Sequence, residues 1–265
     1  MDSEKELQTA KEEMKIRGFS PKTIKSYSYH IRDFLEYCGC YNKERKREYI
    51  LYLINRKLDS STVRLASAAI DFHIINVKND TSHKVPIPKR KKRLPNVITK
   101  EQIKAMIQAT TNLKHRLIIE LLYSSGVRLS ELIHLKVEDI GQNNGTIRVR
   151  QGKGSKDRIT IISKLLALRI MEFKHSGRVF EGRNGRYSPK SVQLVLEKAA
   201  GKAAIRQKVT PHMLRHSFAT HLLEKGVDIR YIQDLLGHER LQTTQIYTHV
   251  ANTKIKGIEN PLDGI

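Results

Sequence analysis

The sequence predicts a mainly α-helical protein with a small β-sheet, divided into two domains. Its 265 residues exceed the roughly 150 of an ordinary domain. Apolar residues recur at helical spacing along most of the chain, whereas one short stretch alternates with the two-residue period of strands. A basic, proline-rich segment interrupts both patterns. We therefore expect a helical domain over residues 1–84, a linker over 85–97 and an α+β domain over 98–265.

Four helices are expected in the first domain, three of them with a recognisable start. The remaining helix, around residues 49–54, is apolar on nearly all sides, so we expect it to be the buried one. Together the four form a small helical bundle. The start signals are a Ser3 and Glu6 capping box, a Ser20 N-cap followed by Pro21, and a fourth helix that begins near Ser60 or Ser61.

The segment KVPIPKRKKRLP (84–95) predicts an extended interdomain linker, because its prolines disfavour regular structure. Five basic residues follow one another within it. We expect this run to contact phosphates, and the alternatives are a nuclear-import signal or a merely solvated stretch. The five residues are Lys89, Arg90, Lys91, Lys92 and Arg93.

In the second domain, residues 145–162 have the pattern of a β-hairpin with a basic tip. Ile147 and Val149 alternate with arginines, and Ile159 and Ile161 resume the alternation. Two glycines flank Lys153 between these runs, as expected of a turn. The other boundaries indicate helices: a Thr99 and Gln102 capping box, a start at Thr210-Pro211 with an end at Gly226, a start at Asp228 with an end at Gly237, and a Thr243 or Thr244 cap on a helix that carries Tyr247.

Composition predicts a globular and strongly basic protein. Hydrophobic residues make up 39% of the chain and charged residues 29%, which excludes a collagen-like or membrane-spanning chain. No apolar run reaches the roughly 18 residues of a membrane helix, and the N-terminus lacks the apolar core of a signal peptide. We expect a cytoplasmic protein whose Cys38 and Cys40 are reduced, because two cysteines are too few for a disulfide framework or a zinc site.

The formal net charge of +22 predicts a polyanionic partner. An anionic membrane surface is the alternative to nucleic acid, but no segment combines a basic face with a Trp/Phe/Leu face. Nucleic acid is therefore favoured. If about 6–10 phosphates are contacted, affinity should fall ~10³–10⁵-fold between about 50 and 200 mM salt.

Four polar clusters are candidates for chemistry, although each alone has an ordinary structural explanation. Arg128 could be a surface arginine, Lys153 a turn lysine, His238 a helix C-terminal histidine and Tyr247 a half-buried core residue. The clusters are GVRLSEL (126–132) with Arg128 and Glu131, the hairpin tip with Lys153, HMLRH (212–216), and LGH (236–238) followed by Tyr247.

His212 and Arg215 lie one helical turn apart in the first turn of their helix, so they can bind one phosphate together. The alternative is a metal site, because His212 and His216 have the H-x-x-x-H spacing of zinc ligands. Met213 replaces the glutamate of the zinc-protease motif, however, and the intervening arginine repels a cation. We therefore expect no metal.

In this order the clusters resemble the site-specific tyrosine recombinases of the phage integrase family, and most closely its Xer-type chromosome-dimer resolvases. The resemblance is densest in SSGVRLSEL (124–132) and in residues 210–250. Ser125 and Val127 depart from the family's common threonine and leucine without removing a functional group. The resemblance implies an N-terminal, helical SAM-like core-binding domain and an α+β catalytic domain.

It also implies a role for each matching residue. Tyr247 attacks the scissile DNA phosphate to form a 3′-phosphotyrosyl intermediate. The other implied roles are transition-state binding by Arg128 and Arg215, general acid catalysis by Lys153, acid/base work by His212, phosphate hydrogen bonding by His238 and orientation of the site by Glu131.

The resemblance implies no cofactor, neither metal nor ATP, and double-stranded DNA with a specific recombination site as partner. Four copies are expected on two sites, with a C-terminal tail over residues 257–265 donated to a neighbour and no membrane association. The alternatives are an integrase of a mobile element, a non-catalytic DNA-binding protein and a monomeric topoisomerase. The target sequence and any accessory recombinase or translocase stay open.

Overall fold

The computed structural model describes residues 2–39, 43–80, 85–88, 96–150, 157–182, 185–238, 242–245 and 247. Its contacts divide the chain into two compact units, Met1–Arg93 and Leu94–Ile265, here called the N-terminal and C-terminal units. The described residues are mostly helical with two small sheets, which confirms the predicted fold class. No helix among them is long and apolar enough to cross a bilayer. The basic run at 89–93, Lys153 and the tail at 257–265 lie outside the described residues.

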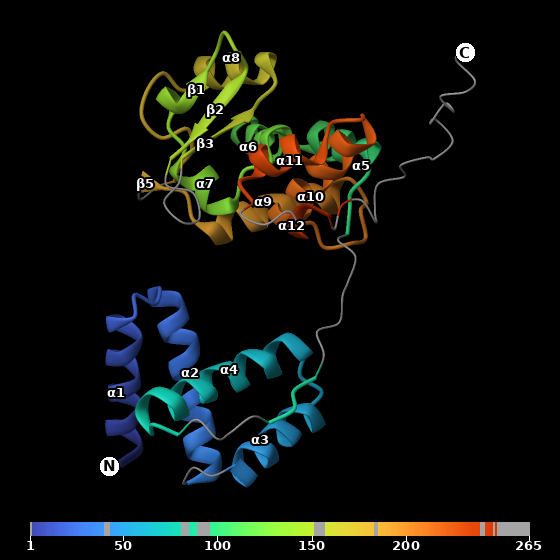
Figure 1. The fold of residues 1–265 in the computed structure, drawn as a ribbon. Coiled ribbons are helices and arrows are strands. Elements are labelled where there is room, and N and C mark those ends of the chain that lie inside the picture. The colour runs from blue at the N-terminus through green and yellow to red at the C-terminus, as the bar shows by residue number, and fades with distance from the viewer. Residues whose placement is uncertain are drawn as a thin grey trace, which may run out of the picture. The chain divides into compact units, whose positions relative to one another are not determined.

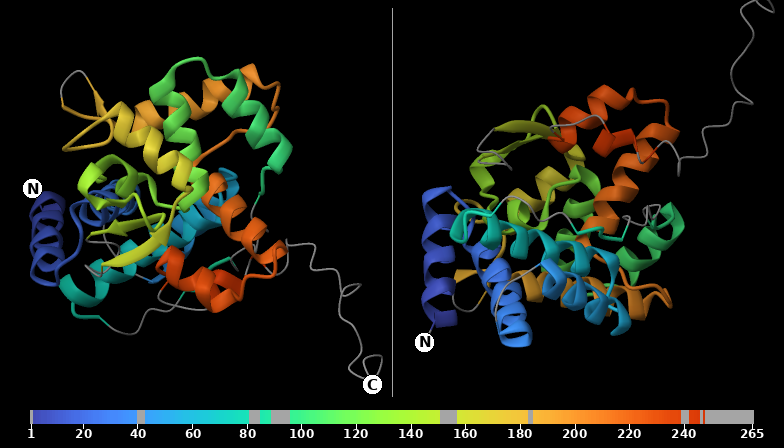
Figure 2. Two further views of the ribbon diagram at one scale, coloured as in Figure 1. Left: turned by 90° about the horizontal axis from the view of Figure 1, so that it is seen from above. Right: turned by 60° about the horizontal axis from the view of Figure 1, so that its bottom comes forward.

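Over its described residues, the N-terminal unit is a bundle of four helices, whose arrangement is seen in Figures 1 and 2. Helices α2 and α4 each pack against all the other helices of the bundle, so these two form its centre. The start of α2 is as predicted, because the Ser20 side chain accepts the Thr23 amide. Cys38, at the end of α2, is buried, and its thiol donates to the Arg45 carbonyl at 3.6 Å, whereas Cys40 is not described. The helices are α1 (Asp2–Ile16), α2 (Pro21–Cys38), α3 (Lys43–Asn55) and α4 (Ser60–Val77).

One predicted helix start in this unit is wrong. Helix α1 begins at Asp2, so Ser3 lies inside the helix and not at its N-cap. The Glu6 carboxylate contacts His73 of α4 at 3.2 Å and pairs with Lys78, so it ties α1 to α4. Helix α4 begins at Ser60, as predicted, and its N-cap is Asp59, whose carboxylate accepts the Ser61 amide at 2.9 Å.

Helix α3 is not the fully buried helix that its apolar composition predicts. Leu51 and Ile54 are 49% and 39% exposed, whereas Tyr49 and Lys46 are completely buried. The Lys46 ammonium pairs with Asp71 of α4, which compensates for its burial. The helix is therefore amphipathic, and its polar lysine faces inward.

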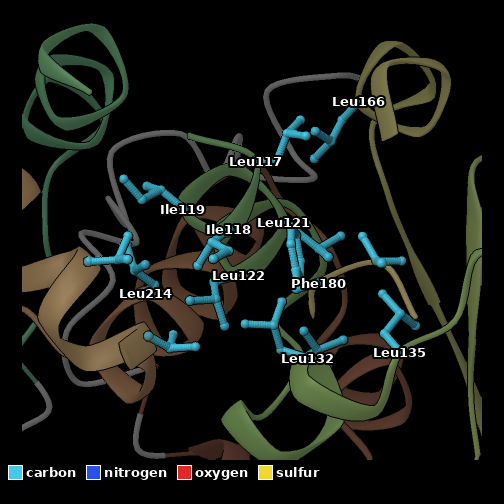
Figure 3. Close-up of a cluster of buried hydrophobic side chains, with 14 of the residues drawn as sticks. Leu117, Ile118, Ile119, Leu121, Leu122, Leu132, Leu135, Leu166, Phe180 and Leu214 are labelled. Atoms are coloured by element: carbon cyan, nitrogen blue, oxygen red, sulfur yellow. The ribbon is translucent and has the colours of Figure 1, made fainter. Parts of the chain in front are cut away.

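The C-terminal unit combines helices with a three-stranded antiparallel sheet in the order β1-β2-β3 and a two-stranded one, β4-β5. Its core surrounds α6, as Figure 3 shows for Leu121 and Leu122 beside Leu132, Phe180 and Leu214. The elements are α5 (Lys100–Ala109), α6 (Leu113–Ser125), α7 (Leu129–His134), a 3₁₀ turn (Val137–Asp139), β1 (Ile140–Gly141), β2 (Thr146–Val149), β3 (Arg158–Ile161), α8 (Lys164–Phe173), β4 (Glu181–Gly182), β5 (Gly185–Arg186), α9 (Pro189–Lys202), α10 (Pro211–Glu224), α11 (Ile229–Leu236) and α12 (Gln242–Gln245).

Strands β2 and β3 form the predicted hairpin, but β3 turns its apolar side outward. Ile147 is buried and lies opposite Thr160, which is buried on the same face. The Thr160 hydroxyl donates to the Ser125 carbonyl at 2.9 Å, so this inward polar group is satisfied. Ile159 and Ile161 consequently face away from the core, 64% and 39% exposed.

Most predicted helix boundaries in this unit are confirmed. Thr99 and Gln102 form the capping box of α5, Thr210 caps α10, and Asp228 caps α11. The last boundary is wrong, because Thr243 and Thr244 lie inside α12 and Tyr247 follows that helix in a turn.

Candidate active site

The loop after α6 places Arg128 through a glycine at which any side chain would be strained. Gly126 has a left-handed backbone (φ 60°), and a Cβ there would lie 2.4 Å from a ring carbon of Phe218. The chain reverses at this glycine and brings Arg128 to the N-cap position of α7. The tight turn therefore sets the position from which the guanidinium extends.

Arg128 is held both at its backbone amide and at its guanidinium. Its backbone amide donates to the Glu131 carboxylate at 2.7 Å, and its guanidinium donates to the same carboxylate at 2.8 Å. A further guanidinium N–H donates to the Gly237 carbonyl at 3.0 Å, at the end of α11. The side chain is 20% exposed, so its remaining N–H groups can still meet a ligand.

Glu131 is bound from its other side by Arg158 of β3, which the sequence reasoning missed. Two parallel hydrogen bonds of 2.7 Å join the guanidinium to both carboxylate oxygens, and the Arg158 Nε donates to the Leu235 carbonyl. Burial alone would raise the pKa of Glu131, but the bonds and charge of Arg158, followed by those of Arg128, lower it to about 2. Glu131 is therefore an anion that joins two arginines.

One signal could have revealed Arg158. It lies opposite Val149 in the hairpin register, and Val149 faces the core. A basic residue directly opposite a buried valine must point inward and needs an acidic partner. The prediction treated the isoleucines of β3 as its main pattern, so this inward arginine was overlooked.

Of the predicted cations that the structure describes, Arg215 is the most deeply buried, with 3% of its surface exposed. Its guanidinium donates to the carbonyls of Gly126 and Leu236, both at 2.6 Å. Burial, and then the nearby charge of Arg128, lowers its pKa to about 9, so it stays cationic at neutral pH. Arg128 thus binds a backbone carbonyl at the end of α11, and Arg215 binds carbonyls at the ends of α6 and α11. Both guanidiniums are therefore fixed by the backbone.

The histidines near these arginines are neutral at physiological pH. His212, in the first turn of α10, is exposed, and desolvation followed by the charges of Arg215 and Arg128 lowers its pKa. The pKa of His238 falls to about 3, first through burial and then through the same arginines. His238 follows the left-handed Gly237, and its Nδ1 lies 3.0 Å from the Thr244 hydroxyl.

Tyr247 is buried, with only 1% of its surface exposed, in a cluster with Phe218, Ile232 and Leu236. Its ring stacks on His238 at a centroid distance of 6.4 Å. Its hydroxyl lies 2.9 Å from Nδ1 of His216. Burial raises the pKa of this phenol to about 12, although the positive charges of Arg215 and Arg128 act in the opposite direction.

These contacts bring together those predicted site residues that the structure describes. Hydrogen bonds, ring contacts or electrostatic effects link six predicted residues to one another: Arg128, Glu131, His212, Arg215, His238 and Tyr247. Two residues that were not predicted, Arg158 and His216, contact members of this group. Lys153 and the five linker residues are not described, so their placement stays a prediction. Within the described residues, no three His, Cys, Asp or Glu side chains gather as metal ligands.

Residues 96–254 match the Phage integrase family, and residues 7–83 match its N-terminal SAM-like domain. The chain therefore belongs to the phage integrase family. It is a tyrosine recombinase, an enzyme that cuts and rejoins DNA at specific sites.

Its relatives include Xer recombinases of archaea and bacteria. It is 39% identical to tyrosine recombinase XerA of Thermococcus kodakarensis, over 89% of this chain and 87% of the relative. It is 34% identical to XerD of Halalkalibacterium halodurans, over 91% of each. Among solved structures, a XerA recombinase has a TM-score of 0.55 at 30% identity, covering 93% of this chain and 94% of that one. XerH bound to palindromic difH substrate, a post-cleavage complex, shares the fold with a TM-score of 0.74 at 22% identity, covering 91% and 80%.

Proposed function

We propose that this chain resolves chromosome dimers in the manner of Xer recombinases, cutting duplex DNA through a 3′-phosphotyrosyl intermediate made by Tyr247. The observation that carries this proposal is a buried phenol beside two fixed guanidiniums. The phenol oxygen bonds to phosphorus, the bond to the 5′-oxygen breaks, and a 5′-hydroxyl is released. One phosphodiester replaces another, so the exchange is reversible without ATP.

Arg128 and Arg215 are proposed to stabilise the pentacoordinate transition state. Negative charge collects on its non-bridging oxygens, where preorganised donors act most strongly. Both guanidiniums are already anchored by backbone carbonyls or a carboxylate, so they need little rearrangement when the phosphate arrives. Removal of one such donor typically costs ~10²–10³ in rate.

Proton transfer is assigned to groups around this anion site. Lys153 gives a proton to the departing 5′-oxygen, His212 serves as acid or base, and His238 donates a hydrogen bond to the phosphate. Lys153 lies five positions before Arg158, which is anchored to Glu131. The anchored strand gives the lysine-bearing tip a fixed base.

The phenol is almost entirely protonated before DNA binds. A pKa of about 12 leaves an ionised fraction near ~10⁻⁵ at neutral pH. Tyr247 therefore needs the cationic surroundings and a proton acceptor to become a nucleophile. The positive charge of Arg128, Arg215 and Lys153 supplies the stabilisation that divalent metal gives to other nucleases, so we expect cleavage in EDTA.

Double-stranded DNA with a specific site is the proposed partner, supported by the net charge of +22 and by the DNA-bound structures of relatives. We propose that the basic residues at 89–93 contact its phosphates and that residues 1–84 and 98–265 are separate domains on it. Four copies assemble on two sites and exchange their tails, and the enzyme acts in the cytoplasm on the nucleoid.

Trapping with a nicked suicide substrate, whose cleaved fragment diffuses away, tests the chemistry. The wild type should accumulate a covalent protein–DNA adduct, also in EDTA, whereas Tyr247→Phe should bind DNA equally well and form none. An adduct in the variant would contradict the assignment of Tyr247.

Sequencing the trapped adducts from genomic DNA tests the biological role. Dimer resolution predicts one principal site per chromosome. Sites at the ends of a mobile element would favour the alternative, an integrase.

A further inference from the structure

The histidine that contacts the candidate nucleophile is His216, which no prediction assigned to the reaction. We propose that His216 is a positioning residue, whose Nδ1 accepts the hydrogen bond of the Tyr247 hydroxyl and fixes the direction of that hydroxyl. This inference rests on the proposed function, because it matters only if Tyr247 attacks DNA.

The proposed direction of the hydrogen bond agrees with the protonation states of both rings. Burial, and then the neighbouring His212 and Arg215, lowers the pKa of His216 to about 4, so its ring is neutral at pH 7. The phenol keeps its proton, because its pKa is about 12. A neutral imidazole carries its single proton on Nδ1 or on Nε2. In the tautomer that we propose the proton lies on Nε2, so Tyr247 donates across the 2.9 Å contact and His216 Nδ1 accepts.

The same values argue against His216 as the group that removes the proton. An acceptor of pKa about 4 is far too weak to take a proton from a phenol of pKa about 12. What the contact provides is geometry. The Tyr247 ring is held by stacking on His238 and by its apolar neighbours, and the hydrogen bond fixes the hydroxyl, which otherwise rotates.

Helix α10 places this acceptor next to the proposed phosphate ligand. His216 directly follows Arg215, whose guanidinium is fixed by the Gly126 and Leu236 carbonyls. One helical segment thus holds both a cation for the phosphate and the hydroxyl that attacks it. Small displacements of a nucleophile relative to its target cost large factors in rate.

The same helix contains a matched control. Nδ1 of His221 lies 2.9 Å from the Tyr123 hydroxyl, the same distance as in the His216 pair, and both contacts are partly buried. Removing either histidine leaves a tyrosine hydroxyl without this partner, at a similar cost in stability. Only the His216 pair includes the proposed nucleophile, so a comparison separates positioning from folding.

The test compares His216→Asn and His216→Leu with His221→Asn and His221→Leu, by the single-turnover rate of adduct formation on the nicked suicide substrate. Asparagine can offer an acceptor oxygen near the position of Nδ1, whereas leucine offers none. We expect His216→Leu to be ~10–100-fold slower and His216→Asn to stay within about fivefold of the wild type. Both His221 variants should cleave at the wild-type rate.

Two accompanying measurements complete the test. DNA affinity and the fraction folded should be similar in the two leucine variants, and nitrogen NMR of labelled histidine should show the Nδ1 signal of His216 shifting in Tyr247→Phe. A wild-type rate in His216→Leu, or an equal loss in His216→Asn and His216→Leu, would overturn the positioning role. Failure of the proposed function is distinguishable, because an adduct would then still form in Tyr247→Phe.

Discussion

Two tyrosine–histidine pairs lie along α10 and share the same local geometry. Tyr123 meets His221, and Tyr247 meets His216, each through Nδ1 at 2.9 Å. Their ring centroids are 5.8 and 5.4 Å apart. The hydrogen bond alone therefore does not distinguish a structural phenol from a candidate nucleophile.

The charges around the two phenols differ in sign. Burial raises the pKa of Tyr123, and Glu224 and Glu101 raise it further. Burial also raises the pKa of Tyr247, but Arg215 and Arg128 oppose the increase. A phenolate is thus disfavoured by burial and by two carboxylates at the first pair and stabilised by cations at the second, which is the property that nucleophilic attack requires.

The largest effect on the cleavage rate should come from removing one of the two cations near Tyr247. We expect Arg128→Gln to slow adduct formation ~10²–10³-fold, because one donor to the transition state is lost. Arg169→Gln is the matched control, since Arg169 pairs with Glu120 of α6 and is not one of the proposed site residues. Single-turnover cleavage of the suicide substrate measures both, and equal rates in the two variants would refute the role of Arg128.

Neutralising Glu131, the anion that joins Arg128 and Arg158, should have the next largest effect. Glu131→Gln leaves Arg158 buried without its carboxylate, which we expect to lower the free energy of unfolding by about 3–5 kcal/mol. The Arg128 guanidinium also loses its orientation, so cleavage should slow. Urea unfolding at pH 7 measures the first effect, and a loss below about 1 kcal/mol would contradict the network.

Acid should weaken the same network in wild-type protein. The folded pKa of Glu131, about 2, lies below its ordinary value of 4.5, so this stabilisation is complete above pH 4.5 and is lost as pH falls toward 2. About 3 kcal/mol should disappear over that range, at about 1.4 kcal/mol per pKa unit. Urea unfolding as a function of pH should show this decrease, and Glu131→Gln should lack it.

A smaller effect of pH on stability should come from His216, the histidine that contacts Tyr247. The pKa of His216 is lowered to about 4 in the folded state, so the unfolded chain binds its proton first as pH falls below 6.5. Stability should therefore decrease between pH 6.5 and 4, by up to about 1.4 kcal/mol per pH unit for one proton. His216→Asn should remove one proton's worth of this slope, and an unchanged slope would contradict the buried neutral state of His216.

Sequence patterns were sufficient where the relevant interaction is local. The caps at Ser20, Thr99, Thr210 and Asp228 follow from side chains that bind amides within three residues, and the hairpin follows from the two-residue period. The local rules failed at α3, where Lys46 is buried and pairs with Asp71 of another helix. The residues of the candidate site could also be predicted, since they occur in short recognisable sequence motifs.

What the tertiary structure decided is which groups meet across long separations in the chain. Arg158 reaches Glu131 because the hairpin register turns it inward, and His216 reaches Tyr247 because α10 and the turn after α12 pack together. Neither partner is near the other in sequence, so no periodicity or cap records the contact. The sequence by itself determined the kinds of residue available for phosphate chemistry, whereas packing determined their neighbours, and through charge and burial their pKa values.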